Sequence, residues 1–131
     1  MAAPKFPLTL LTDRYAVCRL EASASIPAWA LRMTQPLSCV LRTGEELSVV
    51  CPEGDVPAGV ERVERGFRAF KLEGPVPFST TGVIAGLTVP LAAQGLSVFV
   101  LSTYDTDYLM VKDATLAKAQ AALRAAGFLV R

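Results

Sequence analysis

The stretch TGVIAGLTVPLAAQGLSVFVLSTYDTDY, residues 81–108, decides the fold. In its first half, four apolar residues recur at the spacing of one helical face, namely Val83, Ile84, Leu87 and Leu91. Gly95 stands where a residue in the left-handed conformation commonly ends a helix. Because Pro90 interrupts the pattern and lacks a backbone donor, we expect a kinked or short helix over residues 83–94.

The second half of the stretch predicts a hairpin. The apolar runs at residues 96–102 and 108–112 are expected strands, and the polar segment from Thr103 to Asp107 is the turn between them. Around the stretch we expect, in chain order, a strand at residues 67–72, a helix from an N-cap at Asp113 to Gly127 and a strand at residues 128–130. The resulting order is βαββαβ.

The first half of the chain repeats part of this order. The segment AVCRLE at residues 16–21 resembles RAFKLE at residues 68–73, and VLRTGEELSVV at residues 40–50 resembles VLSTYDTDYLMV at residues 100–111 with one residue inserted. The matching elements are expected strands at residues 15–20, 37–42 and 47–51 and a short helix at residues 27–33. Two prolines and two glycines at residues 52–59 replace the second helix.

The repeat predicts two ferredoxin-like βαββαβ modules, a degenerate one at residues 1–65 and a complete one at residues 66–131. The expected strand at residues 63–72 is long enough to end the first module and begin the second. We therefore expect one pseudo-symmetric α+β unit, with helices on one face of antiparallel sheets. Phe99 and Leu101 give the strand at residues 96–102 a second apolar face, which favours a homodimer.

Composition and charge exclude several functional classes. The chain has 131 residues and is 52% hydrophobic, but it contains no run of 18 apolar residues that could span a membrane. Pro7 and Asp13 break the N-terminal stretch before a signal peptide could be completed, so we expect a cytoplasmic protein. The two halves, divided after Arg65, carry net charges of −1 and +2, so we expect no binding to nucleic acid or membrane.

The chain contains no histidine, which removes the Ser/His/Asp and Cys/His nucleophiles and the usual zinc ligand sets. Cys18, Cys39 and Cys51 are odd in number, lack CxxC spacing and lie in expected strands. We interpret them as buried free thiols rather than disulfides or metal ligands. The sequence therefore predicts a protein without catalysis, metal or cofactor.

The helix opening TGVIAGL with Pro90–Leu91, followed by GLSVFVLSTYDTDY at residues 95–108, resembles the ACT modules found in tandem in small bacterial proteins and in the animal cytosolic arginine sensors. The resemblance implies an amino-acid-binding regulatory domain whose ligand lies between the loop before a module's first helix and a neighbouring module. Carried onto this sequence, it places ligand contacts at Ser79, Thr80, Thr81, Gly82, Val83, Ile84, Thr103, Asp105, Thr106 and Asp107.

Elementary chemistry is consistent with this location. A glycine-containing loop that opens a helix exposes backbone N–H groups able to hold a carboxylate. Asp105 and Asp107 could accept hydrogen bonds from an ammonium or guanidinium group, so a zwitterionic or cationic amino acid would fit. Alternatively, the two aspartates satisfy the backbone of their own turn, and residues 79–81 are ordinary helix caps.

Other polar and aromatic residues have simpler interpretations. Glu45, Glu46 and Asp55 could form an acid/base pair or a metal site, but an exposed hairpin tip explains them as well. Tyr15 and Trp29 could line a site, but core packing also accounts for them.

Three functions compete. The first is a regulatory protein that binds an amino acid, and because no catalytic or DNA-binding domain is fused to it, its output passes through an unidentified partner protein. The second is an interaction or assembly module of the same fold without a ligand. The third is an enzyme that uses carboxylates or a cysteine thiol, which would require an exposed thiol beside a base or cation.

Overall fold

The computed structural model describes residues 5–32 and 36–131. It divides into two compact units, one made of Met1–Thr12 with Arg68–Arg131 and the other of Asp13–Phe67. The boundary between two modules expected after residue 65 stays a prediction, and in this division the beginning of the chain groups with the second half. Backbone pairing explains this grouping, because the Leu8 N–H donates to the Leu129 carbonyl at 2.8 Å and Leu8 pairs in parallel with Val130.

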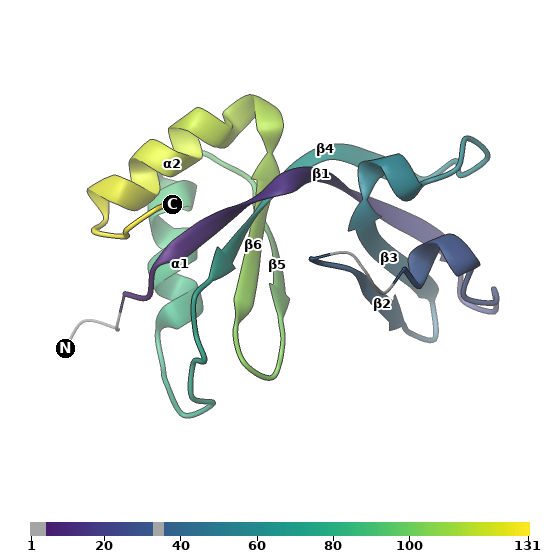
Figure 1. Cartoon of the computed structure of the whole chain (residues 1–131), viewed down its shortest axis with the longest axis horizontal. Helices are drawn as coiled ribbons and strands as arrows, with labels where there is room; N and C mark the ends of the chain where they lie inside the picture. Colours follow the sequence, from purple (N-terminus) through teal and green to yellow (C-terminus); the bar gives the residue numbers. More distant parts are fainter. Residues whose placement is uncertain (1–4, 33–35) are drawn as a thin grey trace. The chain divides into compact units, whose positions relative to one another are not determined.

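The strands form a six-stranded sheet in the order β2-β3-β1-β4-β6-β5 (Figure 1). Their bounds are β1 Leu8–Glu21, β2 Cys39–Arg42, β3 Glu46–Pro52, β4 Val63–Leu72, β5 Phe99–Ser102 and β6 Asp107–Lys112. Residues 63–72 form a single strand, as predicted. β5 is shorter than expected, although Leu96 and Val98 before it still pack against the core.

In the unit formed by Met1–Thr12 and Arg68–Arg131, helices α1 (Val83–Ala93) and α2 (Leu116–Ala125) pack against β4 and β6 (Figure 1). Alternate strand residues face these helices because side chains alternate along a strand. The buried core consists of Leu8, Phe70, Leu72, Val83, Leu87, Leu91, Leu109, Val111, Ala119, Leu123, Phe128 and Val130. The predicted α+β arrangement with helices on one sheet face therefore describes this unit.

Local signals predicted α1 closely. The helix begins at Val83 as expected and continues through Pro90 to Ala93. Gly95 has a φ of 71°, which confirms the predicted left-handed residue after the helix.

The prediction that Asp113 caps the second helix is wrong. A 3-10 turn, Asp113–Thr115, precedes α2, so Thr115 and not Asp113 is the residue before the helix, and Thr115 makes no side-chain capping hydrogen bond. The Asp113 carboxylate lies 3.3 Å from the Arg68 guanidinium of β4. The helix therefore begins at Leu116, later than the sequence pattern predicted.

The unit Asp13–Phe67 contains strands and two short 3-10 turns. β1 pairs with β3 in antiparallel register, with Cys18 opposite Val49, and β2 pairs with the other side of β3. The helix expected at residues 27–33 is wrong for its described part, because only the 3-10 turn Ala28–Ala30 forms; residues 33–35 lie outside the described residues. A second turn, Glu53–Asp55, stands where the prolines and glycines excluded a helix.

The three cysteines are free and lie in strands β1, β2 and β3. Cys18 and Cys51 are buried, whereas Cys39 is half-buried. Burial raises the pKa of all three thiols, and burial together with the nearby Cys18 and Asp55 raises the pKa of Cys51 to about 11. These thiols are therefore protonated at neutral pH and are poor nucleophiles.

Two aromatic residues that the sequence offered as possible site residues, Tyr15 and Trp29, lie in or beside the core of this unit. Tyr15 is fully buried, and Trp29 packs beside the cluster that contains Cys18 and Cys51. Asp55 forms an ion pair with Arg32 at 3.7 Å. Within residues 5–32 and 36–131, no group of three or more His, Cys, Asp or Glu side chains could hold a metal ion. In the same part of the chain, no helix is both long and apolar enough to cross a bilayer.

Candidate functional site

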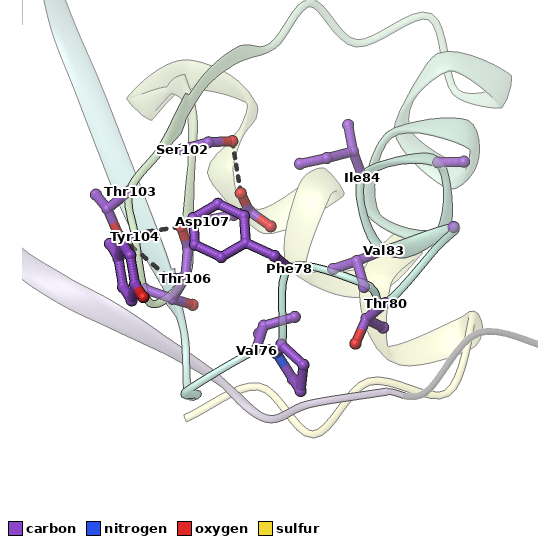
Figure 2. Close-up of a pocket in the computed structure, with 13 residues that line it drawn as sticks. Val76, Phe78, Thr80, Val83, Ile84, Ser102, Thr103, Tyr104, Thr106 and Asp107 are labelled. Atoms are coloured by element: carbon purple, nitrogen blue, oxygen red, sulfur yellow. Dashed lines mark hydrogen bonds between the residues drawn. The ribbon is translucent and has the colours of Figure 1, made fainter.

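A pocket of about 360 Å³ lies in the unit that contains both helices. It is lined by the loop after β4, the first turn of α1 and the turn between β5 and β6 (Figure 2). Its lining consists of Val76, Pro77, Phe78, Thr80, Gly82, Val83, Ile84, Ala85, Ser102, Thr103, Tyr104, Thr106 and Asp107.

A backbone contact holds the loop against the turn. The Val76 N–H donates to the Asp105 carbonyl at 2.7 Å. Gly74 makes this approach possible, because a Cβ atom there would lie 2.7 Å from the Val76 nitrogen and 2.9 Å from the Asp105 oxygen. A side chain at residue 74 would therefore separate the two walls of the pocket.

Two threonines shape the turn. The Thr103 hydroxyl accepts from the Thr106 N–H and donates to the Thr106 carbonyl, each at 3.1 Å. The Thr106 side chain is buried, and its hydroxyl donates to the Leu72 carbonyl of β4. Both hydroxyls thus hold the backbone, that of Thr103 within the turn and that of Thr106 at β4.

The two aspartates of the turn are in different positions. Asp107 is the first residue of β6, lies opposite Ser102 in the strand pair and accepts a 2.6 Å hydrogen bond from the Ser102 hydroxyl. Asp105 is exposed and is not part of the lining. Asp107 is consequently the one charged side chain among the residues that line the pocket.

The N-terminus of α1 forms the opposite wall. Gly82 precedes the helix with a φ of 80°, and no side chain caps the helix there, so the interpretation of residues 79–81 as caps is wrong. The Gly86 N–H makes the first helical hydrogen bond, to the Gly82 carbonyl. The N–H groups of residues 83–85 come earlier and have no partner within the helix itself.

Two exposed aromatic rings complete the pocket. Phe78 is 74% exposed and Tyr104 is 80% exposed. Their rings meet edge to face, with centroids 4.8 Å apart and planes at 82° (Figure 2). Large apolar rings in this position are unusual for a solvated loop, because burying them is favourable. They give the rim of the pocket an exposed apolar surface.

The structure brings most of the predicted contacts together and separates a few from them. Thr80, Gly82, Val83, Ile84, Thr103, Thr106 and Asp107 line the pocket. Ser79, Thr81 and Asp105 do not. Sequence reasoning missed Val76, Pro77, Phe78, Ala85, Ser102 and Tyr104; the available signal was the presence of an aromatic residue in each of two polar, turn-rich segments.

Comparison with known proteins gives matches over both halves of the chain. Residues 62–125 match the model of the ACT domain, and residues 13–59 match a model of an N-terminal domain. No curated protein matches the chain.

Several solved structures resemble the chain, with different sequence identities and TM-scores. Protein Atu0741 from Agrobacterium tumefaciens is 38% identical, with a TM-score of 0.91 over 98% of this chain and 94% of that one. A Vibrio cholerae protein described as a possible transport protein of unknown function is 22% identical, with a TM-score of 0.73 over 92% of this chain and 89% of that one.

Escherichia coli aspartokinase III, solved in complex with aspartate and ADP, is 12% identical, with a TM-score of 0.67 over 97% of this chain and 34% of that one. At these identities the last two likenesses concern the fold alone. The pocket lies inside the segment that matches the ACT domain. With this ACT match and the identity to the Agrobacterium protein over nearly the whole of both chains, the chain belongs to the same family as protein Atu0741.

Proposed function

We propose that the protein binds a free amino acid in this pocket and regulates a partner protein. The observation that carries the proposal is the pairing of two complementary groups across one small cavity. The N-terminus of α1 offers backbone N–H groups on one wall, and Asp107 offers a carboxylate on the other. A volume of about 360 Å³ lies at the lower end of the range for small-molecule sites, roughly 300–1,000 Å³.

Each end of a zwitterion has a partner in this arrangement. The ligand carboxylate accepts hydrogen bonds from the N–H groups of residues 83–85, where the helix dipole also favours negative charge. The ligand ammonium donates to the Asp107 carboxylate, whose Oδ1 already accepts from Ser102. The hydroxyl of Thr80 lies in the lining and supplies a further polar contact.

The ligand could regulate a partner protein because the two walls of the pocket belong to different elements, α1 and β6. A bound amino acid connects the start of α1 to the start of β6, so it stabilises conformations in which these elements are adjacent. A partner that recognises the same conformations is then affected by the ligand, and the coupling is reciprocal. We propose no catalysis, because the lining contains one carboxylate and no thiol, and its other ionisable side chain, the phenol of Tyr104, is 80% exposed to water.

We also propose that the protein forms a homodimer. β5 is at the end of the strand order in the described chain, so one side of it is an edge. Residues 96–103 contain neither a charged residue nor a proline, which are the residues that commonly protect an edge from pairing. Light scattering measures the mass directly, and a monomer at micromolar concentration would contradict the homodimer without affecting the ligand proposal.

The second candidate is a module of the same fold that acts in assembly without a ligand. The exposure of Phe78 and Tyr104 favours it, because exposed aromatic residues are common at protein interfaces. A thermal-shift screen with the twenty amino acids separates the two functions. A ligand at one hundred times its Kd stabilises the native state by about 2.7 kcal/mol, which raises the Tm by several degrees.

Two variants make the screen specific to the pocket. Asp107→Asn removes the charge that faces the cavity, and the matched control Asp105→Asn makes the same change in the same turn outside the lining. We expect the shift to be lost in Asp107→Asn and kept in Asp105→Asn. A screen without any shift favours the assembly module, and equal loss in both variants contradicts the assigned role of Asp107.

A further inference from the structure

We infer that the pocket selects an amino acid with one carboxylate and an apolar side chain, and that it rejects the acidic amino acids. The inference rests on the proposed function and adds the class of ligand. It is argued from the charges and the apolar surface of the lining residues.

The charges of the pocket oppose a second carboxylate. Asp107 is the one charged side chain among the lining residues, which include no lysine or arginine. The N–H groups at the start of α1 can hold one carboxylate. A side-chain carboxylate of aspartate or glutamate would therefore lie in a cavity of this size near Asp107 without a cationic partner. Two negative charges held close together in one small cavity repel each other and weaken binding. This repulsion becomes stronger as water is excluded from the cavity.

The rest of the lining is suited to an apolar side chain. Val76, Phe78, Ile84 and Tyr104 surround the space beside the polar groups (Figure 2). The rings of Phe78 and Tyr104 keep most of their surface in water, and Ile84 is 38% exposed. A branched or aromatic ligand side chain would remove part of this surface from water, which is favourable in proportion to the apolar area.

A cationic side chain has weaker support in the same lining. The aromatic faces could accept a cation, at about 0.5–1 kcal/mol for an exposed site. However, the one carboxylate is already shared between Ser102 and the ligand ammonium. A guanidinium or second ammonium would thus lack the hydrogen-bonding anion that it normally finds in a specific site. The geometry favours a side chain of zero charge.

Isothermal titration of the full-length protein with leucine, phenylalanine, aspartate, glutamate and arginine tests this inference. We expect leucine or phenylalanine to bind at least tenfold more tightly than aspartate or glutamate, and more tightly than arginine. Aspartate or arginine as the tightest ligand would overturn the inference and leave the proposed function intact. An absence of binding by every amino acid would overturn both.

Two further measurements assign the selectivity to these residues. Phe78→Ala is expected to weaken binding of the apolar amino acid about tenfold at an unchanged Tm, because the ring is mostly exposed. The matched control, Val89→Ala, truncates a 63% exposed apolar residue of α1 outside the lining and should leave the Kd unchanged. Equal Kd values for both variants would contradict a role for the aromatic wall.

The charge contribution has its own measurement. In Asp107→Asn the ratio of the aspartate Kd to the leucine Kd is expected to fall towards one, even though both ligands bind more weakly. A ratio that stays as large as in the unmodified protein would show that repulsion by Asp107 is not what rejects acidic amino acids.

Discussion

Gly74→Ala separates the two walls of the pocket, and its cost can be worked out from the structure. The added Cβ would lie 2.7 Å from the Val76 nitrogen and 2.9 Å from the Asp105 oxygen, and both are backbone atoms that cannot rotate away. The substitution therefore removes the hydrogen bond between them, which contributes about 1 kcal/mol, and forces a backbone shift that costs about 1–3 kcal/mol. The expected loss of stability is about 2–4 kcal/mol.

Calorimetry or thermal melting of the full chain measures this loss. For 131 residues, an unfolding entropy of about 2.1 cal/mol/K per residue converts each kcal/mol into roughly 4 °C, so we expect the Tm to fall by roughly 10 °C. The matched control is Gly59→Ala, where an added Cβ meets nothing within 4 Å. Equal melting temperatures for the two variants would refute the close approach at Gly74. Weakened amino-acid binding in Gly74→Ala alone is a second expected result.

Three other perturbations have expected outcomes. Gly82→Ala places a side chain at a φ of 80° and should lower the free energy of unfolding, measured by urea denaturation, by about 1–2 kcal/mol. Gly82→Asn should lower it less, because asparagine tolerates this conformation. Equal losses in the two variants would contradict backbone strain at this residue. Thr106→Val removes the hydroxyl that donates to the Leu72 carbonyl and should lower stability by about 1–3 kcal/mol, and an unchanged unfolding midpoint would show that this hydrogen bond contributes little. The folded-state pKa of Cys51, about 11, lies above the ordinary 9.0, so the unfolded chain loses this proton first and stability should fall as pH rises from 9 to 11. Cys51→Ala should show a shallower fall over that interval, and identical slopes would contradict the raised pKa.

Several features of the fold could be predicted from the sequence because their causes are local. Apolar spacing and the glycine after the helix predicted α1, and the long strand predicted at residues 63–72 is β4. The prolines and glycines of residues 52–59 excluded a second helix in the first half, where only a 3-10 turn forms. The helix-opening loop and the hairpin turn line one pocket within a single unit, whereas a ligand between this loop and a neighbouring module stays a prediction.

Local signals failed at several helix starts. Asp113 has the sequence position of a helix cap, but a 3-10 turn at Asp113–Thr115 comes first, and α2 begins at Leu116. Thr80 and Thr81 precede a helix, yet the left-handed Gly82 stands at its start and no side-chain cap forms. The helix expected at residues 27–33 would have been only seven residues long, which is too short to be stable without tertiary support, and its described part forms a single 3-10 turn.

The sequence by itself therefore determined the secondary-structure type of the second half, the position of its turns and the absence of histidine chemistry. Only the tertiary structure decided which residues of those turns meet. Asp105 and Asp107 are equivalent in the sequence pattern, but the pairing of Ser102 with Asp107 brings only the second into the pocket lining. Phe78 and Tyr104 are 26 residues apart, and their rings meet because the backbone bond beside Gly74 joins the two loops. Such contacts depend on long-range backbone pairing, which no local pattern of residues specifies.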